Sequence, residues 1–313
     1  MLVDKAKVGK IVAQRLGLSN SPLLSEITQG LSHCCFRAIA DKQTLFVKVF
    51  SERNASVNDH SFIEQQAMIA KLTGDCGLSP KLIDVDKEHR LLINEYVAGQ
   101  SPKLTASDTE ADKEADKQST QTIKILAECA YRTHQLVLPV SAIKLQKVIQ
   151  QLLRAVNLSD EQNSDILGRV NQIVDEIAID KSNLVSCHGD INLNNILLTD
   201  HTNCHIGSNL IQLVDWEYAC LAEREYEVAM CASINQLSRS QTADLVHYYQ
   251  QLSSINGVAT VKLDNNKVTR YLVICNIINH LWFCLYDLDN AESDSSISGF
   301  AIYKFILTTL HQS

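Results

Sequence analysis

Three residues of this chain have side chains and spacing suited to catalysis. They are an aspartate, an asparagine five positions later and a second aspartate after a strand-like segment. Asp190 and Asn195 belong to the run HGDINLNN, and Asp215 begins the run DWEYA. A carboxylate in a tight turn can take the proton of a hydroxyl group, so Asp190 is a candidate general base. The side-chain oxygens of Asn195 and Asp215 are hard ligands of the kind that Mg²⁺ prefers. These are the parts that transfer of a phosphoryl group from ATP to an alcohol requires.

Apolar runs flank these residues where strands are needed to bring the two expected metal ligands together. The run ILL follows Asn195 and the run LV precedes Asp215. The two runs predict a hairpin that places Asn195 and Asp215 side by side. Taken singly, His-Gly-Asp and Asn-Asn are also ordinary turn residues between strands. Their joint spacing with the apolar runs favours phosphoryl transfer.

The first hundred residues predict a sheet and one helix. Alternating apolar and polar residues predict two strands joined by a turn within 26–50 and a second strand pair within 81–97. Between them a helix is expected over 59–72. The stretch 99–120 is polar, with Ser, Thr and mixed charges, and predicts a solvated connecting loop.

Beyond residue 120 the apolar spacing becomes helical. Stripes of apolar residues recur at helical intervals over 126–134 and 145–156, and Ser159 with Gln162 resembles a capping box that opens a further helix. We therefore expect an α+β fold with two lobes. The expected division is a small β-rich N-terminal lobe, residues 1–97, and a larger, mainly helical C-terminal lobe, residues 98–313.

Composition argues against some partners. The net charge of −8 gives no support for a nucleic-acid or anionic-membrane surface. The most membrane-like stretch, 271–286, is interrupted by Asn276, Asn279 and His280, and we interpret it as too short to span a bilayer. The N-terminal residues lack the apolar core of a signal peptide, and the ten cysteines include no C-x-x-C pair. We expect a cytoplasmic protein with reduced thiols.

The two motifs resemble those of a known superfamily. HGDINLNN and LVDWEYA are similar to the H-G-D-x-x-x-x-N and D-W-E-Y-A signatures of the aminoglycoside phosphotransferase/choline kinase superfamily, most closely its choline, ethanolamine and thiamine kinase branch. The resemblance covers nearly the whole chain and implies a protein-kinase-like fold that uses ATP and Mg²⁺. It implies that Asp190 is the catalytic base and that Asn195 and Asp215 are metal ligands. His188 resembles the motif histidine that braces the loop.

The same resemblance assigns a lysine and a carboxylate to the nucleotide. Lys48, in the strand-like run FVKVF, is similar to the lysine that reaches the ATP phosphates. A solvent-facing lysine on an amphipathic strand is the alternative. Glu64, in the helix that follows, is the expected partner of Lys48, although Glu52 is another carboxylate nearby.

Two further segments are expected to bind the nucleotide. TQGLSHCCFRA resembles the loop over the phosphates, in which Gly30 allows close backbone approach and Ser32 offers a hydroxyl group. The segment departs from richer glycine loops at His33. INEYVAG resembles the hinge, where backbone groups from Glu95 to Val97 are expected to bond the adenine.

The acceptor is expected to be a small alcohol, because no long segment ending in an Ala-Pro-Glu-like motif follows the second aspartate. Asn192 lies where related enzymes contact substrate. Trp282 and Tyr286 are one helical turn apart and would present ring faces to a quaternary or heteroaromatic cation, although core packing explains them equally well. Glu217, in an acidic cluster, would suit a cationic acceptor. A solvated acidic face explains the cluster equally well.

Several alternatives stay open. The chain could be an aminoglycoside or sugar phosphotransferase, or a nucleotide-binding pseudokinase that serves as an interaction module. His201, Cys204 and His205, with Cys187 and His188 nearby, could be imagined as a zinc site, but their spacing matches no usual zinc pattern. The expected state is a monomer or a homodimer.

Overall fold

The computed structural model forms two compact units. Unit 1 comprises Met1–Pro102 and Asn194–Glu217, and unit 2 comprises Lys103–Leu193 and Tyr218–Ser313. Within them the structure describes residues 4–27, 33–41, 43–51, 60–104, 113–156, 158–199, 210–255, 262–290 and 299–310.

The expected division at residues 97 and 98 differs from these units in two places. Residues 98–102 and the segment Asn194–Glu217 were expected in the C-terminal lobe, but both belong to unit 1 with the N-terminal residues. The N–H of Leu213 donates to the carbonyl of Leu78 at 2.7 Å, and Gln100 and Leu198 exchange backbone hydrogen bonds of 3.0 and 2.9 Å. Such bonds join residues that are more than 90 positions apart in sequence, so local periodicity cannot predict them.

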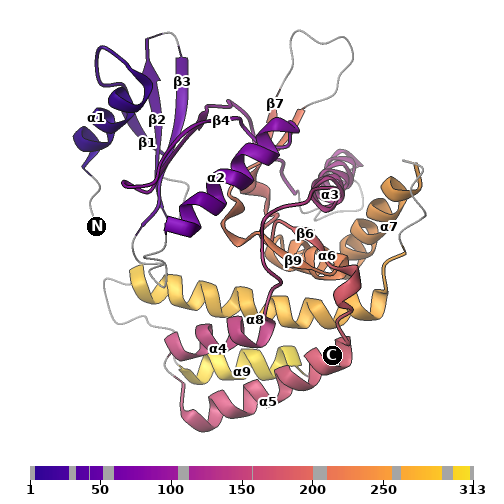
Figure 1. Ribbon diagram of the computed structural model, residues 1–313. Helices are drawn as coiled ribbons and strands as arrows, with labels where there is room; N and C mark the ends of the chain where they lie inside the picture. Colours follow the sequence, from indigo (N-terminus) through magenta and orange to yellow (C-terminus); the bar gives the residue numbers. More distant parts are fainter. Residues whose placement is uncertain are drawn as a thin grey trace. The chain divides into compact units, whose positions relative to one another are not determined.

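Unit 1 contains the sheet expected from the first hundred residues. Its antiparallel strands lie in the order β1-β2-β3-β5-β4, with bounds Leu23–Ile27, Cys34–Ala40, Gln43–Val49, Leu91–Glu95 and Leu82–Asp86 in that order. Figure 1 shows β1, β2 and β3 side by side with α1, Lys5–Leu16, packed beside them.

The two faces of this sheet pack against different helices. Apolar residues of β3 and β5 such as Val47 and Ile93 pack in one cluster with Val8 and Val12 of α1. Leu92 points to the other face, because successive side chains of a strand alternate, and packs with Ile63 of α2, His60–Asp75. The same alternation turns Lys48 away from the α1 cluster.

A second antiparallel hairpin completes unit 1. It consists of β7, Ile196–Thr199, and β8, Leu210–Leu213, with Ile196 opposite Leu213. This is the hairpin that the apolar runs predict, and it brings the chain positions of Asn195 and Asp215 to the same end.

Unit 2 is mainly helical. Its strands β6, Val185–Cys187, and β9, Cys220–Ala222, pair antiparallel. Figure 1 shows α8 running beside α4, α9 and α6. The helices are α3, Lys113–His134; α4, Leu145–Ala155; α5, Asp160–Ile177; α6, Arg224–Ile234; α7, Arg239–Ile255; α8, Asn265–Asn290; and α9, Gly299–Leu310. The expected α+β class is confirmed.

Two helices are longer than the sequence pattern suggests. The helix α3 begins at Lys113, inside the expected loop 99–120. The run KEADKQ is polar but made largely of good helix formers, so polarity alone was a poor sign of a loop.

The predicted capping box is present at the start of α5, with Ser159 and Gln162 bonding each other's backbone N–H.

The helix α8 is also longer than expected. The expectation covered only 271–286, whereas the apolar segment of the helix is Asn265–Tyr286, which is long and apolar enough to cross a membrane by length and composition alone. Its 18-residue window has a mean hydropathy of 1.3, and 44% of that window is buried inside the structure. The helix contacts α4, α5, α6 and α9 in unit 2. A helix that packs against helices on several sides must be apolar on several faces, which accounts for its composition.

Candidate active site

The turn that carries Asp190 follows β6 in unit 2. Gly189 has a φ of 78°, and a Cβ at this position would overlap the carbonyl oxygen of Tyr218. Glycine alone combines left-handed backbone with this close approach of another chain segment. The turn therefore requires Gly189 for two independent reasons.

The carboxylate of Asp190 has partners within the same turn. Nδ2 of Asn192 donates to Oδ1 of Asp190 at 3.0 Å, and the backbone N–H of Asn192 donates to the Asp190 carbonyl at 2.9 Å. The backbone N–H of Asp190 donates to Nδ1 of His188 at 3.2 Å, and His188 is fully buried. An imidazole nitrogen that accepts a hydrogen bond carries no proton, so His188 braces the turn. Asn192, expected at the substrate, holds one oxygen of the candidate base.

The expected metal ligands lie at the end of the hairpin in unit 1. The N–H of Val214 donates to the carbonyl of Asn195 at 2.9 Å, which ties the residue before β7 to the residue after β8. Asp215 has a φ of 70°, a left-handed conformation that costs a non-glycine residue about 1–2 kcal/mol. Strained residues of this kind cluster at functional sites.

The donor set fits Mg²⁺. The Asp215 side chain is 36% exposed and Asn195 is half-buried, so their oxygens can reach an ion that keeps several waters. One carboxylate and one amide oxygen are a small set of hard ligands. Such a small set of protein ligands suits Mg²⁺, because phosphate groups also ligate this ion.

Lys48 lies beside Asp215 in unit 1. Its Nζ is 2.5 Å from Oδ1 of Asp215 and 3.3 Å from Oε2 of Glu217. Burial lowers the pKa of the Lys48 ammonium, but the two carboxylates outweigh burial and raise this pKa above the ordinary lysine value. Lys48 is therefore a buried cation held by carboxylates, and the alternative of a solvent-facing lysine is wrong.

The structure corrects the role expected for Glu217. Its side chain is only 5% exposed and contacts Lys48 and Nε2 of His33. Nδ1 of His33 accepts the N–H of Ser51 at 3.2 Å, so Nε2 carries the proton and donates to Glu217. Burial raises the pKa of Glu217, but the His33 and Lys48 contacts outweigh it and lower this pKa to about 2. Glu217 is a buried anchor, not a residue of a solvated acidic face.

Glu64 was expected to hold Lys48 and does not. Its carboxylate lies 2.5 Å from Nζ of Lys87, and about half of its side chain is exposed. Ile63 and Ala67 of α2 face the apolar cluster, and Glu64 lies on the exposed side of the helix. Nearness in sequence did not identify the carboxylate that contacts Lys48, because Glu217 lies 169 positions away. No sequence signal identified His33 and Glu217 as a pair.

The other segments expected to bind the nucleotide are the loop over the phosphates and the hinge. Gly30 and Ser32 lie outside the described residues. The N–H of Glu95 donates to the carbonyl of Lys81 at 2.9 Å, so it is already used within the sheet. For the N–H of Val97, no hydrogen-bond partner is found among the described residues.

Trp282 and Tyr286 form a stacked pair on α8 in unit 2. Their ring centroids are 5.9 Å apart and the ring planes differ by 3°. Both residues are half-buried. The pair is thus not a fully buried core contact.

No zinc site of the imagined kind can be described, because His201, Cys204 and His205 lie outside the described residues. The potential ligand atoms of three buried residues lie within 4.8 Å of one another, and these residues are His134, Cys187 and Glu227. His134 bonds the hydroxyl of Tyr249 at 2.7 Å, and Glu227 accepts backbone N–H groups. Hydrogen bonding accounts for this cluster without a metal ion.

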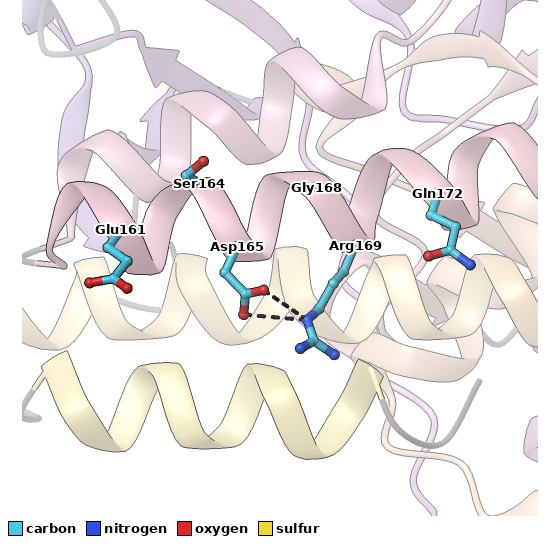
Figure 2. Close-up of a pocket in the computed structure, with 6 residues that line it drawn as sticks. All are labelled: Glu161, Ser164, Asp165, Gly168, Arg169 and Gln172. Atoms are coloured by element: carbon cyan, nitrogen blue, oxygen red, sulfur yellow. Dashed lines mark hydrogen bonds and ion pairs between the residues drawn. The ribbon is translucent and has the colours of Figure 1, made fainter.

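A surface hollow lies apart from these residues in unit 2. Figure 2 shows it along one face of α5, where Asp165 and Arg169 form an ion pair. Its lining consists of Glu161, Ser164, Asp165, Gly168, Arg169 and Gln172. None of the residues that the motifs single out belongs to it, so we assign it no role in the reaction.

Comparisons with known proteins agree with the motifs. Residues 24–261 match the model of the phosphotransferase enzyme family, APH. No curated protein sequence matches the chain. The chain belongs to the phosphotransferase enzyme family, and it is an enzyme that transfers phosphoryl groups to hydroxyl acceptors.

Solved structures share the fold at low identity. Choline kinase LicA from Streptococcus pneumoniae is 14% identical, with a TM-score of 0.72 and 99% of each chain covered. A choline/ethanolamine kinase family protein from Mesorhizobium loti is 18% identical, with a TM-score of 0.66, covering 97% of this chain and 94% of that one. A spectinomycin phosphotransferase in complex with ADP and spectinomycin is 11% identical, with a TM-score of 0.56, covering 100% and 98%. The expected superfamily and the protein-kinase-like fold are confirmed.

Proposed function

We propose that this chain is an ATP- and Mg²⁺-dependent kinase that phosphorylates the hydroxyl group of choline, ethanolamine or thiamine. The observation that carries the proposal is the direct pairing of Lys48 with Asp215 at 2.5 Å in unit 1. A buried lysine next to an aspartate at a strand end is the arrangement that nucleotide phosphates and their metal ion require.

The residues of unit 1 would bind the nucleotide. Lys48, anchored by Glu217, would bond the phosphate oxygens, and Asn195 with Asp215 would hold Mg²⁺. The metal ion, when bound, neutralises the charge that develops on the phosphate oxygens. The N–H of Val97 would donate to the adenine.

The residues of unit 2 would act on the acceptor. Asp190 would take the hydroxyl proton as the acceptor oxygen bonds to the γ-phosphorus and the bond to the β-phosphate oxygen breaks. Asn192, which donates to Oδ1 of Asp190, would keep the carboxylate oriented. The products are ADP and a phosphate monoester.

The choice of acceptor rests on the aromatic pair. A quaternary ammonium or a thiazolium ring is attracted to a ring face by about 0.5–2 kcal/mol. The half-buried, stacked Trp282 and Tyr286 offer such faces. The fold is shared by choline kinases and by a spectinomycin phosphotransferase alike, so an aminoglycoside or a sugar is the second candidate.

A coupled assay for ADP tests both parts of the proposal. The purified chain is supplied with Mg-ATP and separately with choline, ethanolamine, thiamine, aminoglycosides and sugars, and Asp190→Asn serves as the inactive control. We expect turnover of a small amino alcohol or thiamine that the variant loses. Turnover of aminoglycosides or sugars alone would refute the acceptor class. Tight binding of Mg-ATP without turnover of any acceptor would instead favour the pseudokinase.

A further inference from the structure

Two asparagines lie in the apolar helix α8 where it contacts α6. Asn276 and Asn279 share one face of α8, because residues three apart on a helix are neighbours. The hydroxyl group of Ser233, in α6, donates to Oδ1 of Asn276 at 2.6 Å. Nδ2 of Asn279 donates to Oγ of the same serine at 2.8 Å. A single hydroxyl group therefore holds the two amide groups next to each other.

One polar atom of each amide group is left for a ligand. Among the described residues, no hydrogen-bond partner is found for Nδ2 of Asn276 or for Oδ1 of Asn279. Both residues are half-buried, and neither atom is among the fully buried side-chain atoms that lack a partner in the described part of the chain. A bound molecule can therefore reach both atoms. They offer it one hydrogen-bond donor beside one acceptor.

The amide groups and the turn that carries Asp190 lie at the same end of α6. Asn235 directly follows this helix, two residues after Ser233. Its Nδ2 lies 2.8 Å from the carbonyl oxygen of Ile191, and its Oδ1 accepts the N–H of Leu193 at 3.0 Å. All of these residues belong to unit 2. The end of α6 therefore connects the candidate base with the two amide groups of α8.

The aromatic pair of α8 lies past this end of α6. Glu223, which precedes α6, accepts from Nζ of Lys267 near the start of α8 at 2.7 Å. Ser233, in the last turn of α6, bonds residues further along α8. The two helices therefore run in the same direction, and α8 extends past α6 at Trp282 and Tyr286.

The face of α8 that carries the amide groups continues to these stacked rings. Trp282 follows Asn279 by three residues and Tyr286 follows it by seven, and such spacings share one face of a helix. All three side chains are half-buried. Seven residues span about 10 Å of helix, so a ligand with two linked rings can contact the amide groups and the aromatic pair together.

The three acceptors of the proposed function match this face differently. The quaternary ammonium group of choline has no N–H, and the ammonium group of ethanolamine offers donors without an acceptor. Thiamine alone joins a thiazolium ring, which carries the hydroxyethyl group, to an aminopyrimidine ring. The amino group and the adjacent ring nitrogen of that ring are a donor beside an acceptor. Asparagine amides bind the amino group and ring nitrogen of adenine in the same way.

We propose that Asn276 and Asn279 are specificity residues that bind the aminopyrimidine ring of thiamine, with its thiazolium ring on Trp282 and Tyr286. Nδ2 of Asn276 would donate to the ring nitrogen, and Oδ1 of Asn279 would accept from the amino group. The hydroxyethyl group would then lie on the side of the aromatic pair, past the end of α6, where Asp190 takes its proton. This inference rests on the proposed function and narrows its three acceptors to one.

A pair of ligands tests the aminopyrimidine. Thiamine is compared with its N-benzyl thiazolium analogue, which keeps the thiazolium ring, the hydroxyethyl group and an aromatic substituent but lacks the amino group and the ring nitrogen. Release of ADP measures phosphorylation, and isothermal titration without ATP measures binding. We expect the wild type to prefer thiamine about tenfold or more in kcat/KM and in affinity, because the analogue leaves a donor and an acceptor unpaired.

Two variants and a matched control test the residues in the full-length protein. Asn276→Ala removes the donor, and Asn279→Ala removes the acceptor. Asn266→Ala removes an exposed amide group near the start of the same helix and is the control. We expect the first two variants to lose most of the preference for thiamine, with kcat/KM for the analogue within about twofold of wild type. The control should keep the wild-type preference.

The ratio between the two ligands separates specificity from packing. A variant that only loosens the contact between α6 and α8 would weaken both ligands alike, and that result would overturn the inference. If either alanine variant does not fold, Asn276→Asp replaces it, because aspartate keeps the shape and the acceptor for Ser233 but loses the donor. Its charge acts on both cationic ligands alike, so a lost preference for thiamine still reports the lost hydrogen bond.

The outcomes also separate this inference from the proposed function. Phosphorylation of choline or ethanolamine in preference to thiamine would overturn the inference and leave the proposed function standing. If the wild type phosphorylates no acceptor, the proposed function fails, and the titrations alone decide whether the amide groups bind the aminopyrimidine. Absence of thiamine binding would overturn the inference, as would an equal preference for thiamine in Asn276→Ala, Asn279→Ala and the control.

Discussion

The ammonium group of Lys48 and the carboxylate of Asp215 form a direct ion pair, with Nζ 2.5 Å from Oδ1. The lysine expected at the phosphates and the aspartate expected at the metal ion thus contact each other directly. The pair keeps both charges satisfied and close to where they are needed.

Replacement of Lys48 should abolish most of the activity. We expect Lys48→Met to lower kcat/KM about 100-fold or more, because the phosphates lose a buried cation and two carboxylates lose their partner. The matched control is Lys87→Met, which removes a lysine whose ion pair with Glu64 is about half-exposed. That variant should keep wild-type kinetics, since exposed pairs contribute little. Equal losses in both variants would contradict the role of Lys48.

Glu217 and Glu64 compete for one role, and a pair of isosteric variants decides between them. We expect Glu217→Gln to weaken ATP binding and lower kcat/KM about tenfold, because the amide no longer balances the charge of Lys48. Glu64→Gln should change neither, because Glu64 contacts Lys87 instead. Isothermal titration with ATP and steady-state kinetics measure both effects. A larger loss in Glu64→Gln would restore the partner that the family resemblance implies.

Gly189 should tolerate no side chain. We expect Gly189→Ala to lower the free energy of unfolding by about 2 kcal/mol or more and to remove activity, because the new Cβ meets Tyr218 in a left-handed backbone conformation. Gly17 is the matched control, since its φ is 64° but open space surrounds it. Gly17→Ala should cost only about 1 kcal/mol. Denaturant unfolding compares the two, and equal costs would show that strain alone matters at Gly189.

The buried carboxyl group of Glu227 should make the fold less stable as pH rises, which is opposite to the usual effect of a carboxyl group. Burial, together with the charge of Asp190, outweighs the N–H bonds and raises the pKa of Glu227 to about 7 from 4.5. Between these values the unfolded state binds fewer protons, so the free energy of unfolding falls as pH rises, by at most about 1.4 kcal/mol per pH unit. Above about pH 7 this contribution is lost. Glu227→Gln should remove it.

Buried His134 opposes this trend and must enter the comparison. Burial lowers the pKa of His134 to about 3, so the unfolded state binds more protons between about pH 3 and 6.5 and acid destabilises the fold. The test is therefore the difference between wild type and Glu227→Gln in denaturant unfolding from pH 4.5 to 8. The variant should lose stability more steeply on acidification. Parallel profiles would show that Glu227 ionises normally in the folded protein.

The aromatic pair on α8 should matter only for a cationic acceptor. We expect Trp282→Ala to raise KM for choline or thiamine about 2- to 30-fold with little change in kcat, as the loss of 0.5–2 kcal/mol requires. Trp282→Phe keeps a ring face and should recover most of the affinity. Kinetics with each acceptor measure both variants. An unchanged KM in Trp282→Ala would assign the pair to packing alone.

Local patterns were enough to predict the elements that surround the chemistry. The hairpin that joins Asn195 to Asp215 follows from two apolar runs, because strand periodicity depends on neighbouring residues. The turn at Gly189 follows from a short motif. The part of the stretch 99–120 that begins at Lys113 was misjudged, since charged residues serve loops and helices equally and only packing selects between them.

The sequence by itself determined the family, the α+β class and the candidate residues Asp190, Asn195 and Asp215, because motif spacing and periodicity are local properties. Only the tertiary structure decided that Glu217 anchors Lys48. It also decided that α6 holds the turn around Asp190 through Glu227 and Asn235. These contacts join residues from about 40 to 170 positions apart, and they depend on which face of a strand or helix each side chain occupies once the core has formed.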